Sequence, residues 1–222
     1  GQPNVRASTS GIEKRVPLAS VVIEPTENSE TPIVTFDACY FEGNTQGGGQ
    51  IAVAVNGPAT VNVSNCAFRS HGAFVHLRDR CTLKQTEVNL QHCEGFVTQG
   101  PVFRFNSKAS GTIRARNSGF FNPEGAVVGD RPQPGLIYLA GEEPIHFEGN
   151  LNLYRNLNAL VERKKIAEPL PLIDSREKFQ KFLAEHKSAD VNSEYLTQSS
   201  PDPLQYANAP TRTATDGLAF QA

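Results

Sequence analysis

Short stretches of this 222-residue chain carry apolar residues at every second position. Residues 51–55 and 73–77 are clear examples, with Ile, Val, Ala or Leu recurring along each stretch. Apolar residues with a period of two over four to six positions are typical of β-strands. Gly, Pro, Asn and Asp cluster between the stretches, and these residues favour turns. The pattern therefore predicts about five units of strand, turn, strand, turn.

One position of these units holds the same kind of residue at a regular interval. Cys39, Cys66 and Cys93 are 27 residues apart, and an aromatic residue follows each one within three positions. Ser118 and Asn150 take the place of the cysteine in two later copies. In a parallel β-helix each strand pairs with its equivalent one coil later, so one residue type can recur in a column. The spacing therefore predicts such a column.

Regularly spaced strands fit two architectures, a sandwich or barrel and a parallel β-helix. A sandwich or barrel pairs consecutive strands through short hairpins, which favour Asn-Gly or Asp-Gly turns. Only Asn56-Gly57 approaches such a turn, and Pro58 follows it. We therefore predict an all-β fold, a parallel β-helix (solenoid) of about five coils, with a short C-terminal helix and an extended arm.

Segment 61–68, with the sequence VNVSNCAF, resembles the coils of right-handed parallel β-helix proteins of the pectin-lyase-like class, and a related pattern returns at 88–96. This resemblance covers about 140 residues and implies a fold rather than an activity. Segments 192–196 (NSEYL) and 216–221 (DGLAFQ) are similar to the non-kinase portion of large bacterial serine/threonine-kinase-related proteins. The second resemblance implies a β-helix attached to a signalling protein.

Three regions are predicted along the chain. Residues 1–17 form a polar N-terminal segment, residues 18–157 the β-helix, and residues 158–222 a C-terminal helix and extended tail that pack on the β-helix. The chain begins with Gly and contains no Met, and we interpret it as part of a larger protein.

A short helix is predicted at 175–187 because apolar residues there follow a helical period. Phe179, Phe182 and Leu183 share one face by their i, i+3, i+4 spacing, while polar residues occupy the other face. Asp174 or Ser175 stands where a helix N-cap is expected, and Glu177 follows in the first turn. The terminal coil of a solenoid needs a cover, so we expect the apolar stripe to pack on the β-helix.

Charge and hydropathy argue against two classes of partner. The chain has 21 Lys and Arg against 23 Asp and Glu, a formal net charge of −2, so no electrostatic attraction for nucleic acid is expected. No apolar run approaches the ~20 residues of a membrane helix, so no membrane span is expected. The oligomeric state and the compartment stay open, with an extracytoplasmic location expected if the β-helix is the outer portion of a membrane-attached parent chain.

The cysteines and carboxylates provide no complete catalytic or metal motif. The 27-residue spacing lacks the close ligand pairs of a metal site, and buried free thiols are expected, with one disulfide between neighbouring coils as the alternative. Ser70-His71-Gly72 is the nearest likeness to a polysaccharide-hydrolase motif, but no Asp pair accompanies it. No complete kinase motif is present. We therefore predict no catalytic, cofactor-binding or metal-binding residues and no cofactor.

Six polar residues are concentrated in the predicted coils and form a candidate ligand groove, with a merely solvated surface as the alternative. They are His71, His76, Arg78, Asp79, Arg80 and His92. We expect a non-catalytic recognition or scaffold module of a larger bacterial serine/threonine-kinase-related protein, with carbohydrate or protein as the ligand. The alternative is a carbohydrate-active enzyme of the pectin-lyase-like class, either a polysaccharide lyase or a glycoside hydrolase.

Overall fold

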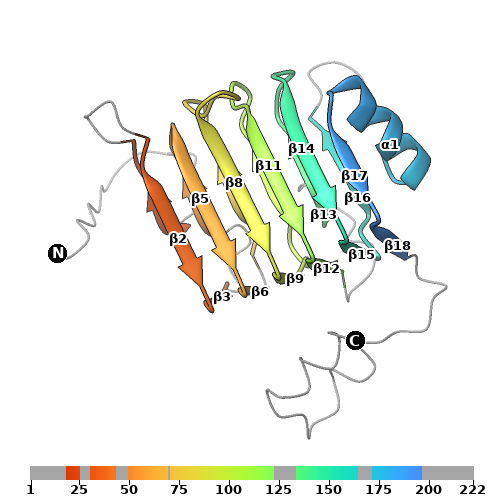
Figure 1. Cartoon of the computed structure of the whole chain (residues 1–222), viewed down its shortest axis with the longest axis horizontal. Helices are drawn as coiled ribbons and strands as arrows, with labels where there is room; N and C mark the ends of the chain where they lie inside the picture. Colours follow the sequence, from red (N-terminus) through yellow and green to blue (C-terminus); the bar gives the residue numbers. More distant parts are fainter. Residues whose placement is uncertain are drawn as a thin grey trace, which may run out of the picture.

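The computed structural model of the chain contains eighteen strands and one helix in the residues that it describes. These residues are 19–25, 31–43, 50–69, 71–122, 134–164 and 172–196. The strands form three six-stranded sheets, here called A, B and C, in which adjacent strands come from successive coils (Figure 1). Adjacent strands pair in parallel throughout the three sheets.

Each coil contributes one strand to each sheet. Sheet A contains β1 (Ala19–Ile23), β4 (Ile51–Val55), β7 (Ala73–Leu77), β10 (Phe103–Phe105), β13 (Gly135–Leu139) and β16 (Ala159–Arg163). Sheet B contains β2 (Ile33–Asp37), β5 (Ala59–Ser64), β8 (Thr86–Gln91), β11 (Gly111–Arg116), β14 (Ile145–Asn150) and β17 (Ala189–Val191). Sheet C contains β3 (Tyr40–Glu42), β6 (Ala67–Arg69), β9 (Glu94–Phe96), β12 (Gly119–Phe121), β15 (Leu153–Arg155) and β18 (Glu194–Leu196).

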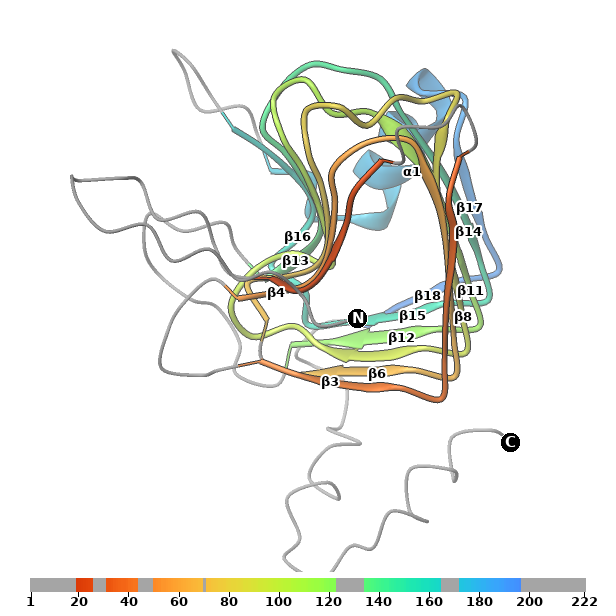
Figure 2. The ribbon, with the colours of Figure 1, turned by 90° about the vertical axis from the view of Figure 1, so that its left-hand side faces the viewer.

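The chain passes through the sheets in the order A, B, C in every coil. Viewed from the N-terminal end it runs clockwise while moving away from the viewer, so the β-helix is right-handed (Figure 2). Six strands in each sheet correspond to six coils, one more than the sequence predicts. The parallel β-helix predicted from the 27-residue interval is confirmed, and its hand is the one that the resemblance implies.

Inward side chains of the three sheets fill the interior of the β-helix. Because side chains alternate across a strand, β5 and β8 of sheet B show alternating buried and more exposed residues. The rings of Phe41, Phe68 and Phe74 stack on one another, with centroids 4.9 Å apart at each step. Burial of such a side chain stabilises the fold by about 1.5 to 3 kcal/mol. Neighbouring coils are therefore held together by their interior as well as by strand pairing.

A tight turn joins sheet B to sheet C in every coil. One residue of each turn has a left-handed backbone conformation, with φ between 48° and 56°. These residues are Ala38, Asn65, His92, Asn117, Leu151 and Asn192. Asn and His tolerate this conformation better than most residues with a side chain. Four of the six turns therefore carry a residue suited to them.

The residue after each left-handed position forms the column that the cysteine spacing predicts. Its members are Cys39, Cys66, Cys93, Ser118, Asn152 and Ser193. A column side chain can accept a hydrogen bond from the backbone N–H of the member one coil earlier, as Cys66 Sγ does from Cys39 at 3.3 Å and Asn152 Oδ1 from Ser118 at 3.1 Å. The fifth member is Asn152 and not Asn150, which ends strand β14 before the turn.

The four cysteines are free thiols, and the column does not contain a disulfide. Cys66, Cys81 and Cys93 are buried, while Cys39 in the first coil is half-buried. Burial raises the pKa of Cys81 and of Cys93 to about 11, so both thiols stay protonated at neutral pH. The expected buried thiols are therefore present at three of the four positions.

The β-helix continues beyond residue 157, where the sequence predicts that it ends. Strand β16 joins sheet A, β17 joins sheet B and β18 joins sheet C. Residues 189–196, predicted to belong to an extended arm, thus complete a sixth coil. The equivalent residues Asn152 and Ser193 are 41 positions apart because helix α1 lies between β16 and β17. This longer interval is why the 27-residue period does not reveal the last coil.

Helix α1 (Arg176–Glu185) confirms the helix predicted at 175–187. Ser175 is its N-cap, and the hydroxyl of Ser175 accepts a hydrogen bond from the backbone N–H of Lys178 at 3.4 Å. This contact satisfies one of the amides that the first helical turn leaves without an intrahelical partner.

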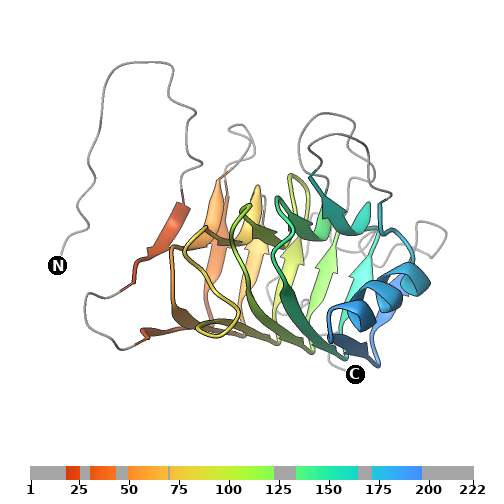
Figure 3. The same ribbon diagram turned by 90° about the horizontal axis from the view of Figure 1, so that it is seen from above.

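The apolar stripe of α1 packs on the C-terminal end of the β-helix. Phe179, Phe182 and Leu183 are buried. The ring of Phe179 lies 6.0 Å from that of Phe147 in β14 and 6.2 Å from that of Tyr195 in β18. Figures 1 and 3 show the helix at the end opposite to β1. The helix therefore covers the last coils, as the stripe predicts.

Two predictions fall on residues that the structure does not describe. They concern the polar segment at 1–17 and the part of the extended tail after Leu196, which includes segment 216–221. Across the described ranges, no helix is both long enough and apolar enough to cross a membrane.

Candidate ligand-binding faces

The six predicted groove residues lie in different parts of the β-helix. His71 follows β6 at the edge between sheets C and A, His76 lies within β7, Arg78, Asp79 and Arg80 follow β7 at the edge between A and B, and His92 follows β8 at the edge between B and C. The structure therefore brings His76 close to residues 78–80 but places His71 and His92 at two other edges.

Three of these six residues have structural roles within the β-helix. His71 is fully buried, with its ring edge-on to Phe74 at 6.1 Å, and burial lowers its pKa to about 4. His92 occupies the left-handed position of a turn. The carboxylate of Asp79 accepts a hydrogen bond from the backbone N–H of Lys108 at 3.2 Å, which joins two coils. His71 is therefore a neutral interior residue at pH 7 rather than a ligand-facing one.

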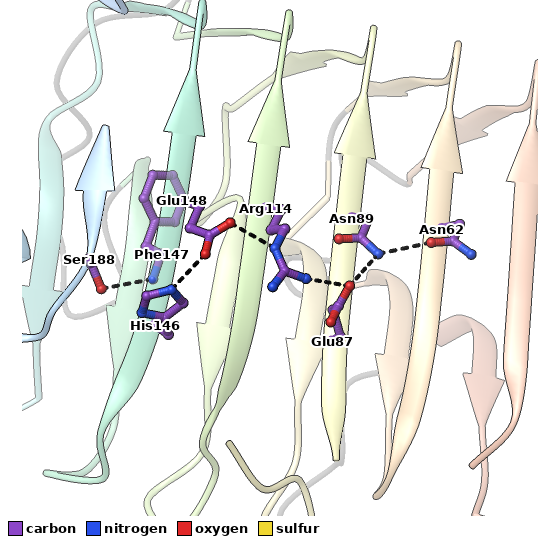
Figure 4. Close-up of polar contacts among 8 residues, drawn as sticks. All are labelled: Asn62, Glu87, Asn89, Arg114, His146, Phe147, Glu148 and Ser188. Atoms are coloured by element: carbon purple, nitrogen blue, oxygen red, sulfur yellow. Dashed lines mark hydrogen bonds and ion pairs between the residues drawn. The ribbon is translucent and has the colours of Figure 1, made fainter. Parts of the chain in front are cut away.

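The outer face of sheet B carries a polar network that the sequence analysis did not identify (Figure 4). Its members are Asn62, Glu87, Asn89, Arg114, His146 and Glu148. They come from β5, β8, β11 and β14, four strands in adjacent coils. In-register pairing aligns Asn62, Asn89, Arg114 and Glu148 in one row across these strands. We call this set the sheet B network.

Hydrogen bonds and ion pairs link the whole sheet B network. Asn89 Nδ2 donates to Asn62 Oδ1 at 2.9 Å and to Glu87 Oε1 at 2.8 Å. Arg114 bridges two carboxylates, with Nη1 2.5 Å from Glu87 Oε1 and Nε 2.7 Å from Glu148 Oε2. The other oxygen of Glu148 lies 2.8 Å from a ring nitrogen of His146. Each side chain therefore has its orientation fixed by at least one neighbour.

The charges in the sheet B network stabilise one another. The hydrogen bond from Arg114, followed by that from Asn89, lowers the pKa of Glu87 below its usual value. His146, followed by Arg114, lowers the pKa of Glu148. The two carboxylates in turn raise the pKa of Arg114. Both glutamates are therefore ionised at neutral pH, and the guanidinium between them carries no uncompensated charge.

The repeat contains a signal that identifies part of this network. Asn62, Asn89, Arg114 and Glu148 each stand four residues before a member of the column. Locating that position in every coil would have predicted the row. The incorrect fifth column member would have shifted its last residue to His146, which belongs to the same network.

The outer face of sheet A carries a second in-register row, which we call the sheet A row. Its members are His76 in β7, Arg104 in β10, Tyr138 in β13 and Glu162 in β16. The guanidinium carbon of Arg104 lies 5.6 Å from the centroid of the Tyr138 ring, a cation–π contact. Of these residues, only His76 was part of the predicted groove.

His76 is held in one orientation within the sheet A row. Its Nε2 lies 2.8 Å from Asn106 Oδ1, and its side chain is buried. Burial lowers the pKa of His76 to about 4, helped by the charges of Arg104 and Arg78 and opposed by the hydrogen bond with Asn106. The imidazole is therefore neutral at pH 7.

Neither metal ligands nor known relatives indicate the chemistry of these faces. Among the described residues, no group of three or more His, Cys, Asp or Glu side chains is placed to hold a metal ion. Comparison with protein-family models, curated proteins and solved structures gives no match for this chain. The two faces must therefore be interpreted from their own geometry.

Proposed function

We propose that this chain is a non-catalytic recognition module that binds carbohydrate on the outer face of sheet B. The observation that carries the proposal is the sheet B network, which presents hydrogen-bonding side chains across four coils in register. Strands in a sheet lie about 4.8 Å apart, so the face repeats its polar groups at a regular short interval. A polymer with regularly repeated hydroxyl groups is complementary to such a face.

The chemistry of the network supports a hydroxyl-rich ligand. A hydroxyl both donates and accepts hydrogen bonds, and amide, carboxylate and guanidinium groups provide partners of both kinds. Internal hydrogen bonds already order these side chains, so less conformational entropy is lost when a ligand binds. The ion pairs are about a third exposed, and such pairs stabilise a fold only weakly. A contribution to fold stability therefore does not by itself explain why these side chains form a network.

The resemblances found in the sequence extend the proposal. The coil pattern at 61–68 supports membership of the pectin-lyase-like class, whose fold type agrees with the three parallel sheets. Segments 192–196 and 216–221 support a place within a larger bacterial serine/threonine-kinase-related protein. In that setting the β-helix would be the ligand-recognising part of a signalling protein.

Binding to an array of neutral and acidic oligosaccharides, followed by titration calorimetry, tests the proposed face. We expect Asn89→Ala to weaken binding at least tenfold, because Asn89 connects Asn62 to Glu87. Glu194→Gln, an exposed change on sheet C, is the matched control and should bind like the parent. Absence of binding to every oligosaccharide, or equal binding by parent and Asn89→Ala, would contradict the proposal.

Assays with the same purified protein distinguish the alternative functions. Release of reducing or unsaturated ends from a polyuronate would instead favour a carbohydrate-active enzyme. Loss of that release in Asp79→Ala would attribute it to the edge between sheets A and B. If no oligosaccharide binds but a purified protein ligand does, the chain is still a recognition module. Its ligand is then a protein, and the proposal of a carbohydrate ligand is wrong.

A further inference from the structure

The sheet A row offers both a hydrogen-bond acceptor and a cationic donor that the described residues leave unused. His76 and Arg104 occupy register-paired positions on the adjacent strands β7 and β10. Paired residues of adjacent strands point to the same face and lie about 4.8 Å apart. The two side chains are therefore neighbours on the outer face of sheet A, away from the sheet B network.

His76 provides the acceptor. Because Asn106 Oδ1 accepts from the Nε2 of His76, that nitrogen carries the hydrogen and the Nδ1 atom keeps its lone pair. Nδ1 is buried and has no hydrogen-bond partner. The side chain is only 5 % exposed, so solvent satisfies this nitrogen poorly. A buried acceptor without a partner is destabilising, and native structures contain few of them.

Arg104 provides the donor and the charge. Its Nε is buried without a hydrogen-bond partner. Its guanidinium lies over the ring of Tyr138, which restricts the orientation of the group. An arginine is always charged and presents a planar set of donors that fits a carboxylate.

We propose that the outer face of sheet A binds a carboxylate ligand that carries a neighbouring hydroxyl group. Arg104 binds the carboxylate, and His76 Nδ1 accepts the hydrogen bond of the hydroxyl. One guanidinium beside a neutral imidazole matches a single negative charge, and Glu162 in the same row disfavours a phosphate dianion. This site uses a different sheet from the proposed carbohydrate face and does not depend on it.

Three small molecules separate the two contacts by titration calorimetry. Glucuronate carries both groups, glucose lacks the carboxylate and acetate lacks the hydroxyl. We expect glucuronate to bind at least tenfold more tightly than glucose or acetate. Equal affinity for glucuronate and glucose, equal affinity for glucuronate and acetate, or no detectable binding of glucuronate would overturn the proposal.

Two variants and one spectroscopic signal locate the site. Arg104→Gln should weaken glucuronate binding at least tenfold, whereas Arg69→Gln, an exposed change at the end of β6 in sheet C, should leave it unchanged. In the parent protein, the nitrogen resonance of His76 Nδ1 should shift when glucuronate is added, a readout that needs no substitution. Unchanged binding in Arg104→Gln, or an unshifted resonance at saturation, would place the ligand elsewhere and contradict the assignment.

Discussion

The two ends of the β-helix are built differently. The last coil, β16 to β18, is covered by α1, whose Phe179 packs against Phe147 and Tyr195. In the first coil, β1 to β3, each strand is the outermost member of its sheet. Ile33 is 72 % exposed there and Tyr40 is 58 % exposed. A helix thus covers the last coil, whereas the described residues place no helix over the first coil.

The stability of the fold depends more on the covered end of the β-helix than on the first coil. Each interior coil pairs with a coil on both sides, but a terminal coil pairs on one side only. The helix supplies the missing contacts at the C-terminal end, and its aromatic side chains belong to the same hydrophobic core as the coils. Substitutions at the covered end should therefore be far more disruptive than equivalent ones at the first coil.

The largest expected effect is the loss of the aromatic cover. Phe179→Ala and Phe182→Ala should each lower the free energy of unfolding by about 3 to 5 kcal/mol, since both rings are buried. The double variant should melt well below the parent and self-associate in light scattering, because the edge of the last coil becomes accessible. Ile33→Ala in the first coil is the control and should change stability by less than about 0.5 kcal/mol. Equal melting of the double variant and the parent would show that α1 does not stabilise the coils.

A smaller effect is expected at the turns between sheets B and C. Leu151 adopts φ of 55° and is 54 % exposed, so its side chain gains little from burial at this strained position. Leu151→Asn should raise the free energy of unfolding by about 0.5 to 1 kcal/mol, because Asn is better suited to a left-handed backbone. The reverse change, Asn117→Leu in another coil, should lower it by a similar amount. Denaturant unfolding measures both values, and destabilisation by Leu151→Asn would refute the explanation.

The aspartates of the two terminal coils should respond to pH in opposite directions. Hydrogen bonds from Ser64 and Asn65 lower the pKa of Asp37, so its stabilising effect is present at neutral pH and is lost as pH falls through that lowered pKa. Burial raises the pKa of Asp190, so the folded state binds its proton more tightly than the unfolded chain does. The contribution of Asp190 to stability therefore grows as pH falls through its raised pKa.

Unfolding of Asp37→Asn and Asp190→Asn between pH 7 and pH 3 tests this contrast. Relative to its own variant, the parent should lose stability on acidification in the Asp37 comparison and gain it in the Asp190 comparison. The same sign of slope in both comparisons would show that burial does not control the titration of Asp190.

The smallest effect concerns thiol reactivity rather than stability. Cys39 of the first coil is half-buried, whereas Cys66, Cys81 and Cys93 are buried. Burial also raises the pKa of each of these three thiols, and the protonated thiol is a poor nucleophile. A disulfide reagent at pH 8 should therefore modify one thiol rapidly and the other three only after denaturant is added. Rapid modification of all four in the native protein would contradict the burial of the column.

The fold could be predicted from sequence because one chemically distinctive residue type recurs at equivalent positions of successive coils. Cys39, Cys66 and Cys93 are rare residue types at an equal interval, and each must occupy the same site of its coil. The spacing of Phe179 and Phe182 likewise identified a helix with one apolar face. These signals depend on local periodicity, which a single sequence contains.

Other features could not be predicted because the signal was interrupted or was not distinctive. The sixth coil follows an insertion that stretches the interval between Asn152 and Ser193 to 41 residues. The fifth column member was misplaced because Gly149 holds the inward position that pairs with Ala115. The apolar residues Ile145 and Phe147 were therefore aligned two residues too early. Outward polar residues such as Arg114 look like any solvent-facing position until strand register shows which of them are neighbours.

Native-state amide hydrogen exchange can test whether residues 189–196 complete a sixth coil beneath α1. The N–H of Glu194 donates to Asn152 O at 2.8 Å, as the N–H of Glu94 in a central coil donates to Cys66 O at 2.9 Å. We expect strong protection of the Glu194 amide, with a protection factor that approaches that of Glu94. Exchange of Glu194 at the rate of an unstructured peptide, while Glu94 stays protected, would contradict the sixth coil.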